Sequence, residues 1–232
     1  MSDLVRIGAA ALGGVLPALA WLWFWLREDS KHPEPRRLIT LAFLAGMISV
    51  AVAVPIEKSV QGYMTSTIMI FTAWSIIEEL LKYAFAYATV LRRREDDEPI
   101  DPVIYMVTVA LGFAAAENTL FLLSPLAGST IMQTILTGNL RFVGATLLHV
   151  LSSAAIGVCL GLTFYKSKRT KRIAALVGVI LASLLHASFN FFILQAPEET
   201  FLRTFVFVWV GVVILLAILE YIKRIHPQII RR

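Results

Sequence analysis

The chain has 232 residues, of which 58% are hydrophobic and 16% are charged. Soluble globular domains are about 45 to 50% apolar, so this composition excludes a soluble protein and indicates an integral membrane protein. The formal net charge is +5, but no basic stripe interleaved with aromatic residues lies outside the apolar stretches. We therefore expect the basic residues to meet the headgroups of the lipid bilayer, and we expect no nucleic acid partner.

Seven apolar stretches are long enough to cross a bilayer, which takes about 20 residues per helix. In chain order they cover residues 4–26, 38–56, 66–90, 102–123, 142–165, 173–195 and 203–222. The first is longer than the roughly 7 to 15 apolar residues of a signal peptide, so we expect it to be retained. Because the stretches occupy most of the chain, residues 1–232 are predicted to form one domain. Its predicted fold is an all-α, polytopic bundle of about seven transmembrane helices.

The basic residues are distributed unevenly over the connections between these stretches. Sixteen of the 21 lie in the first, third and fifth connections or in the C-terminal tail, and four lie on the other side. Since Lys and Arg in short loops mark the cytoplasmic side, we expect a multi-pass protein of the cell membrane with its N-terminus outside and its C-terminus in the cytoplasm. One outer connection, residues 124–141, is interrupted by Pro and Gly, and we expect an interfacial or re-entrant segment there.

Four consecutive stretches carry ionisable or amide side chains near their centres, where each charge costs roughly 2.5 to 3.5 kcal/mol. These residues are Glu78, Glu79 and Lys82 in the third stretch, Glu117 in the fourth, His149 in the fifth, and His186 with Asn190 in the sixth. On helices, the glutamates and histidines would lie on the order of 9 to 18 Å from the predicted outer ends. We therefore expect one polar cavity in the outer half of the membrane, because packing alone can use cheaper groups such as Ser and Thr.

Carboxylates and imidazoles around such a cavity suit two kinds of hydrolytic chemistry. They could hold a divalent metal ion such as zinc, which leaves a position for an activated water. Alternatively, a glutamate could act directly as the general base, with His and Asn side chains as donors to the oxyanion. The sequence contains no HExxH motif, so spacing alone leaves both chemistries open.

Several of these residues lie in motifs that resemble those of the PrsW family of intramembrane proteases. EELLK at 78–82 is similar to the EExxK motif of the family and FAAAEN at 113–118 to its FxxxE motif, while His149 and HASFN at 186–190 resemble its histidine motifs. The wider group includes the CAAX prenyl endopeptidases and Abi proteins. Two features favour the PrsW family over the prenyl endopeptidases. The lysine of the first motif lies at the PrsW spacing, and the second motif has a glutamate where the prenyl endopeptidases have a histidine.

The resemblance implies an intramembrane endopeptidase that cleaves a membrane-anchored protein, in the best-known members an anti-sigma factor on its extracytoplasmic side. We predict that Glu78 is the general base that activates water, and that Glu79 is paired with Lys82. On a helix both glutamates can reach the lysine, at spacings of four and three residues. Adjacent acids titrate as a coupled unit, so the reverse assignment of the two glutamates stays open.

The remaining polar residues are predicted to complete the site. Glu117, His149 and His186 are expected either to bind a divalent metal, zinc, or to position water and the oxyanion without it. Asn190, one helical turn after His186, is expected to orient that histidine or to donate to the oxyanion.

Two other classes of protein also place ionisable residues inside the membrane. An ion-coupled transporter uses them as proton relays, but the sequence shows no inverted repeat. A non-catalytic scaffold would bind the transmembrane helix of a partner in the same cavity. Such a scaffold would tolerate the isosteric change Glu78→Gln, whereas an enzyme would not.

Overall fold

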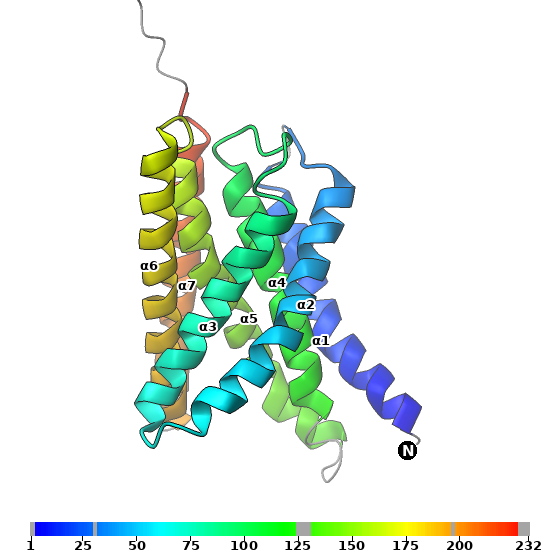
Figure 1. The fold of residues 1–232 in the computed structure, drawn as a ribbon. Helices are drawn as coiled ribbons and strands as arrows, with labels where there is room; N and C mark the ends of the chain where they lie inside the picture. The colour runs from blue at the N-terminus through cyan, green and yellow to red at the C-terminus, as the bar shows by residue number, and fades with distance from the viewer. Residues whose placement is uncertain (1–2, 30–31, 124–130, 196–197, 227–232) are drawn as a thin grey trace, which may run out of the picture.

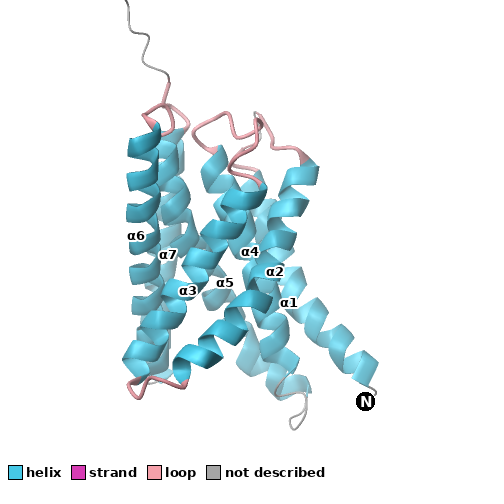
Figure 2. Cartoon of the chain, viewed as in Figure 1, coloured by secondary structure: helices cyan, strands magenta, loops and turns pink. Residues whose placement is uncertain are grey.

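The computed structural model describes residues 3–29, 32–123, 131–195 and 198–226, with side chains described outside 131–143 and 192–205. Within these ranges the chain folds into seven helices and no strand, arranged as one bundle (Figures 1 and 2). The helices are α1 (Asp3–Leu26), α2 (Arg36–Gln61), α3 (Thr67–Thr89), α4 (Asp101–Leu123), α5 (Ile131–Leu162), α6 (Lys168–Gln195) and α7 (Glu198–Ile222). The all-α polytopic fold predicted from the sequence is confirmed.

Among the described residues, five helical segments are long and apolar enough to cross a membrane. They are Asp3–Leu26, Arg36–Gln61, Asp101–Leu123, Gly144–Leu162 and Lys168–Phe191, and a shorter apolar helix covers Val206–Ile222. Helix α3 has the length of a span, but it carries Glu78, Glu79 and Lys82 within one and a half turns. These helices support a multi-pass membrane protein, and the orientation of its termini stays a prediction.

Helix α5 differs from its predicted extent. The helix begins at Ile131, before the span predicted at 142–165, and the candidate span Gly144–Leu162 lies inside that predicted stretch. Residues 131–141 are thus helical, and their interfacial or re-entrant position stays a prediction. Its first eleven residues, IMQTILTGNLR, contain no proline, and a single glycine inside a helix costs only about 1 kcal/mol. The rest of the predicted segment, residues 124–130, lies outside the described residues.

Helix α4 forms the centre of the bundle and contacts α1, α2 and α5 along its length. Its residues from Asp101 to Ala115 are all buried. Where α2 crosses α4, Gly46 faces the backbone at Val109 and Gly112 faces the backbone at Phe43. A Cβ atom at either glycine would overlap a carbonyl oxygen of the other helix. The two helices therefore pack backbone to backbone, as small residues allow in membranes.

A network of acidic side chains closes the end of the bundle that carries the α1–α2 and α3–α4 connections. Asp29 Oδ2 accepts a hydrogen bond from the backbone N–H of Glu34 (3.1 Å), and the Tyr105 hydroxyl donates to Glu34 Oε2. Asp101 Oδ2 accepts from two backbone N–H groups of the α3–α4 connection, at 2.8 and 2.6 Å. Burial raises the pKa of Glu34 from 4.5 to about 8 and that of Asp29 from 3.8 to about 6.

These raised pKa values predict that acidification stabilises the fold. Between pH 4.5 and about 8 the folded chain holds the Glu34 proton more tightly than the unfolded chain does. The contribution of Glu34 to stability is thus fully present below its pKa in the unfolded chain, and it is lost as the pH rises through its pKa in the folded chain. We expect Glu34→Gln to raise the melting temperature by several degrees at about pH 9 and to flatten its pH dependence.

Thermal unfolding of the detergent-solubilised chain, followed by tryptophan fluorescence at several pH values, measures this effect. Glu220→Gln is the matched control, because the Glu220 side chain is 57% exposed. That control should keep the wild-type pH dependence. An unchanged pH dependence in Glu34→Gln would contradict the prediction.

Candidate functional site

Helix α3 turns one polar stripe toward the interior of the bundle. Its buried residues are Ser75, Glu78, Glu79, Lys82 and Ala86, which recur at the spacing of one helical face. The opposite face carries exposed apolar residues such as Ile76 and Leu80. The charges therefore avoid the surface that would meet lipid and face the neighbouring helices α4, α5 and α6.

The two adjacent glutamates have different surroundings. Glu79 Oε1 lies 2.7 Å from Lys82 Nζ and 3.0 Å from His186 Nδ1, and Glu79 Oε2 accepts a hydrogen bond from Ser153 (2.7 Å). Both Glu79 and Lys82 are completely buried. The carboxylate of Glu79 is thus satisfied on both oxygens, which agrees with the predicted pairing of Glu79 with Lys82.

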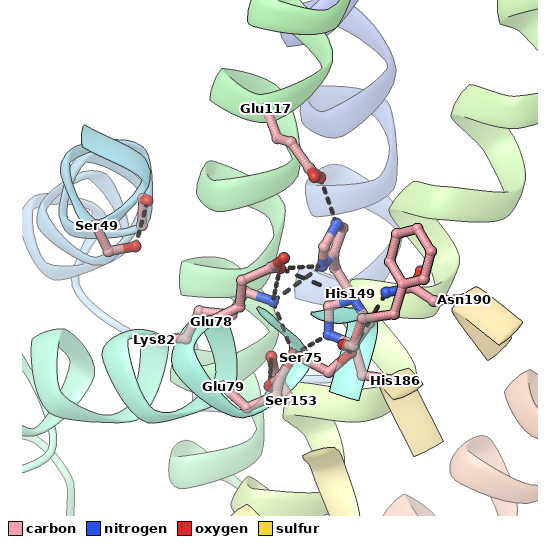
Figure 3. A network of polar contacts seen from close by, with 12 residues as sticks. Ser49, Ser75, Glu78, Glu79, Lys82, Glu117, His149, Ser153, His186 and Asn190 are labelled. Atoms are coloured by element: carbon pink, nitrogen blue, oxygen red, sulfur yellow. Dashed lines mark hydrogen bonds and ion pairs between the residues drawn. The ribbon is translucent and has the colours of Figure 1, made fainter. Parts of the chain in front are cut away.

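Glu78 has the complementary environment. Its Oε2 atom is buried and has no hydrogen-bond partner among the described residues. It lies 3.5 Å from Lys82 Nζ, 3.8 Å from His149 Nδ1 and 3.8 Å from His186 Nε2. Figure 3 shows this carboxylate facing both imidazoles, which come from α5 and α6. Since an unsatisfied buried carboxylate oxygen is costly, this atom is the one most available to a water or an ion.

Each histidine is held by a carboxylate on the nitrogen that faces away from Glu78. His149 Nε2 lies 2.7 Å from Glu117 Oε2, and His186 Nδ1 lies 3.0 Å from Glu79 Oε1. The two rings meet edge to face with their centroids 4.9 Å apart. Such carboxylate partners fix the orientation and the tautomer of a catalytic or metal-binding imidazole.

The donor set fits a divalent cation. One ligand atom each from Glu78, His149 and His186 lies within 4.8 Å of the other two. Two imidazole nitrogens and a carboxylate oxygen are ligands that zinc takes. The orphaned Oε2 of Glu78 and the carboxylates behind both imidazoles also match such a centre. Lys82 Nζ lies 2.9 Å from His149 Nδ1, so an ion would replace the ammonium as the partner of that nitrogen.

The predicted site residues all gather around one point, but two have different neighbours from those expected. Glu117 contacts the far nitrogen of His149, while Glu78 faces the two histidines in the three-residue cluster. Asn190 donates to the Ser75 hydroxyl (3.3 Å) rather than to His186. Ser75 and Ser153 were not predicted from the sequence. Ser153 follows His149 by four residues, which is a same-face spacing that could have identified it.

A pocket of about 200 Å³ leads to this cluster between α2, α3 and α4. It is lined by Val50, Ala53, Val54, Glu57, Glu78, Phe113, Glu117, Leu120 and Phe121. Glu117 is 44% exposed there, in contrast to the nearly buried Glu78. The pocket lies toward the end of the bundle where α2 ends and α3 begins, which is the predicted outer side.

Comparisons with known proteins give a consistent result. A family model described as PrsW family intramembrane metalloprotease matches residues 34–219. Protease PrsW of Geobacillus kaustophilus is 28% identical over 187 residues, which cover 78% of this chain and 78% of that protein. Protease PrsW of Bacillus subtilis is 24% identical over 202 residues, which cover 84% of this chain and 88% of that protein. Protease PrsW of Oceanobacillus iheyensis is 28% identical over 206 residues, which cover 85% of this chain and 89% of that protein. No solved structure matches the chain significantly.

Proposed function

The chain belongs to the PrsW family of intramembrane metalloproteases, and from this premise we propose that it hydrolyses a peptide bond of a membrane-anchored protein on the extracytoplasmic side. An anti-sigma factor with a single transmembrane helix is the substrate class we propose, in a regulated cascade of which this cut is the first. The observation that carries the proposal is the convergence of Glu78, His149 and His186 at the end of a pocket.

Glu78 is assigned to the attacking water. Its Oε2 is a buried carboxylate oxygen with no hydrogen-bond partner in the described structure, and it lies 3.8 Å from each imidazole. A water placed between these three groups would donate one proton to Glu78 Oε2. Its oxygen would then attack the carbonyl carbon of the scissile bond, and Glu78 would pass the proton to the amine nitrogen as the C–N bond breaks.

The other polar residues hold this arrangement. Glu79 orients His186, and Lys82 and Ser153 in turn hold Glu79. Glu117 orients His149 from the far side of the ring. Lys82 also offsets part of the negative charge of the glutamate pair. Positioning of this kind accounts for much of the rate acceleration by an enzyme, because the reacting groups do not have to reorganise during the reaction.

Glu78, His149 and His186 are also the residues that would hold the divalent metal of the family, and zinc is the ion we propose. A bound zinc ion would lower the pKa of water to about 7 and polarise the substrate carbonyl. From the sequence, Glu117 was predicted as a member of this ligand set. The geometry supports Glu78 in its place, with Glu117 as the carboxylate behind His149.

The experiment compares the new N-termini of membrane proteins in cells that express wild type or Glu78→Gln at matched levels, in a strain without the native gene. Mass spectrometry should find fragments that occur only with wild type and begin in the outer half of a transmembrane helix or just outside it. These fragments would identify the substrate. Identical fragment sets, with both proteins folded and the pathway triggered, would contradict the proposal and favour a non-catalytic scaffold or a transporter.

A further inference from the structure

The pocket that leads to the catalytic cluster contains a carboxylate to which the mechanism gives no role. Glu57 lies near the end of α2, two residues after Pro55, and lines the pocket together with Glu78 and Glu117. The carbonyl oxygen of Glu57 accepts a hydrogen bond from Trp74 on α3 (3.4 Å), which ties this turn of α2 to α3. The side-chain Oε1 of Glu57 is buried and has no hydrogen-bond partner within the described residues.

Glu57 is not the only unsatisfied acid that faces this space. Glu78 is 5% exposed, lines the same pocket, and its Oε2 is also without a hydrogen-bond partner in the described part of the chain. Two acids from different helices therefore line one small cavity, and each has a buried carboxylate oxygen without a hydrogen-bond partner among the described residues. Because such oxygens are costly to leave without a donor, the cavity is suited to a ligand that donates hydrogen bonds.

The balance of charge around the pocket favours a cation. Four carboxylates, those of Glu57, Glu78, Glu79 and Glu117, surround the site, and Lys82 is paired with Glu78 and Glu79. Among the described residues, Glu57 forms no ion pair. With all four carboxylates ionised and both imidazoles neutral, the site would have three excess negative charges, and a divalent metal at the cluster would still leave one. Buried charge of one sign is stable only when a partner of the opposite sign is close.

The shape and the walls of the pocket narrow the choice of cation. Apart from its acids, the pocket is lined by apolar residues: Val50, Ala53, Val54, Phe113, Leu120 and Phe121. Lys and Arg bury an apolar stem and carry the charge at its tip, which matches apolar walls with carboxylates among them. At about 200 Å³ the pocket is smaller than the roughly 300 to 1,000 Å³ of sites for drug-sized ligands, so it suits one side chain rather than a helix.

We propose that this pocket binds a lysine or arginine side chain of the substrate close to the scissile bond, and that Glu57 determines this specificity. The inference rests on the proposed function, because it places a substrate segment beside Glu78. Glu117 is engaged with His149, whereas the carboxylate of Glu57 is available for the cationic tip. Glu57 is thus a specificity residue that contacts the substrate without taking part in the hydrolysis.

Binding can be measured without catalysis. The probe is a palmitoylated peptide whose backbone is N-methylated against cleavage, made with either lysine or the uncharged norleucine at one position, and presented to the full chain in nanodiscs. We expect wild type to bind the lysine peptide at least about tenfold more tightly. Glu57→Gln should reduce this ratio to about one, and Glu57→Lys should favour a peptide with glutamate at that position.

Lys58→Gln is the matched control, since Lys58 is the exposed neighbour of Glu57 and does not line the pocket. This variant should keep the wild-type preference for lysine. Equal binding of the two peptides to wild type, or an unchanged preference in Glu57→Gln, would overturn the inference.

A cleavage assay separates this inference from the proposed function. Single-span reporter proteins with a randomised segment next to the membrane are incubated with the protein in liposomes, and the cut sites are read by mass spectrometry. We expect Lys or Arg to be enriched near the cut with wild type and not with Glu57→Gln. Cuts without a basic preference would overturn the inference while the proposed function stands. If wild type cuts nothing, the proposed function fails and the binding ratios alone decide on the pocket.

Discussion

Replacing Glu78 by Gln is expected to lower the rate of substrate cleavage by at least about a thousandfold while the chain stays folded. Gln has the shape of Glu, but its amide neither takes a proton from water nor serves as an anionic metal ligand. Oε2 of Glu78 lies 3.8 Å from each imidazole and has no hydrogen-bond partner in the described structure, so its loss breaks no hydrogen bond of the fold. Single-turnover cleavage of an identified substrate in liposomes measures the rate, and thermal unfolding verifies the fold.

Glu79→Gln is the matched control for this experiment. Glu79 binds Lys82, His186 and Ser153, so its variant should lose stability as well as activity, because a buried ammonium loses its partner. Zinc content, measured in both variants and wild type, distinguishes the two roles of Glu78. Wild-type zinc content in an inactive Glu78→Gln identifies proton transfer as the lost step, and zinc loss identifies ligation. Full activity would remove Glu78 from the mechanism.

Gly112→Ala is expected to destabilise the fold by about 3 kcal/mol or more, although it adds one methyl group. A Cβ at this position would overlap the carbonyl oxygen of Phe43, and the nearest atoms are all backbone of α2. No side chain can rotate away, so α2 and α4 must separate. The separation would also displace Val50, Ala53 and Phe113 at the pocket. We expect a large fall in melting temperature and reduced activity in the protein that remains folded.

Gly8→Ala supplies the control, since a Cβ at Gly8 of α1 would meet nothing within 4 Å. In an exposed helix, alanine is favoured over glycine by about 0.5 to 1 kcal/mol. That variant should be as stable as wild type or slightly more stable. A melting temperature of Gly112→Ala equal to that of Gly8→Ala would contradict the close backbone packing of α2 and α4.

The helices could be predicted from the sequence because the bilayer leaves a backbone few choices. Every N–H and C=O inside it must be paired within the segment, so a long apolar stretch becomes a helix. The exception was the start of α5, where Gln133, Thr134 and Asn139 lower the hydropathy of residues that are nonetheless helical. The hydropathy of a segment measures the preference of its side chains for lipid. The length of a helix depends instead on how far its backbone hydrogen bonds continue.

The residues of the site could be predicted because charged side chains are rare inside apolar stretches and stand out in the sequence. Their pairing between helices could not, because it depends on the rotation of each helix about its axis. The glutamate behind His149 proved to be Glu117, and the one facing both histidines proved to be Glu78. Glu57 was missed because it follows the end of the stretch predicted at 38–56, where a charge is ordinary. It reaches the pocket because α2 continues to Gln61.

The charged face of α3 has a consequence for the synthesis of the protein. With Glu78, Glu79 and Lys82 unpaired, each charge would oppose entry into the bilayer by roughly 2.5 to 3.5 kcal/mol, whereas five other helical segments among the described residues are long and apolar enough to cross a membrane. Lys82 pairs with both glutamates inside α3, but the other partners of these groups come later in the chain, His149 and Ser153 from α5 and His186 from α6. We therefore expect the integration of α3 to become more stable once these helices have left the ribosome. The groups proposed for hydrolysis are thus the same ones that retain α3 in the membrane.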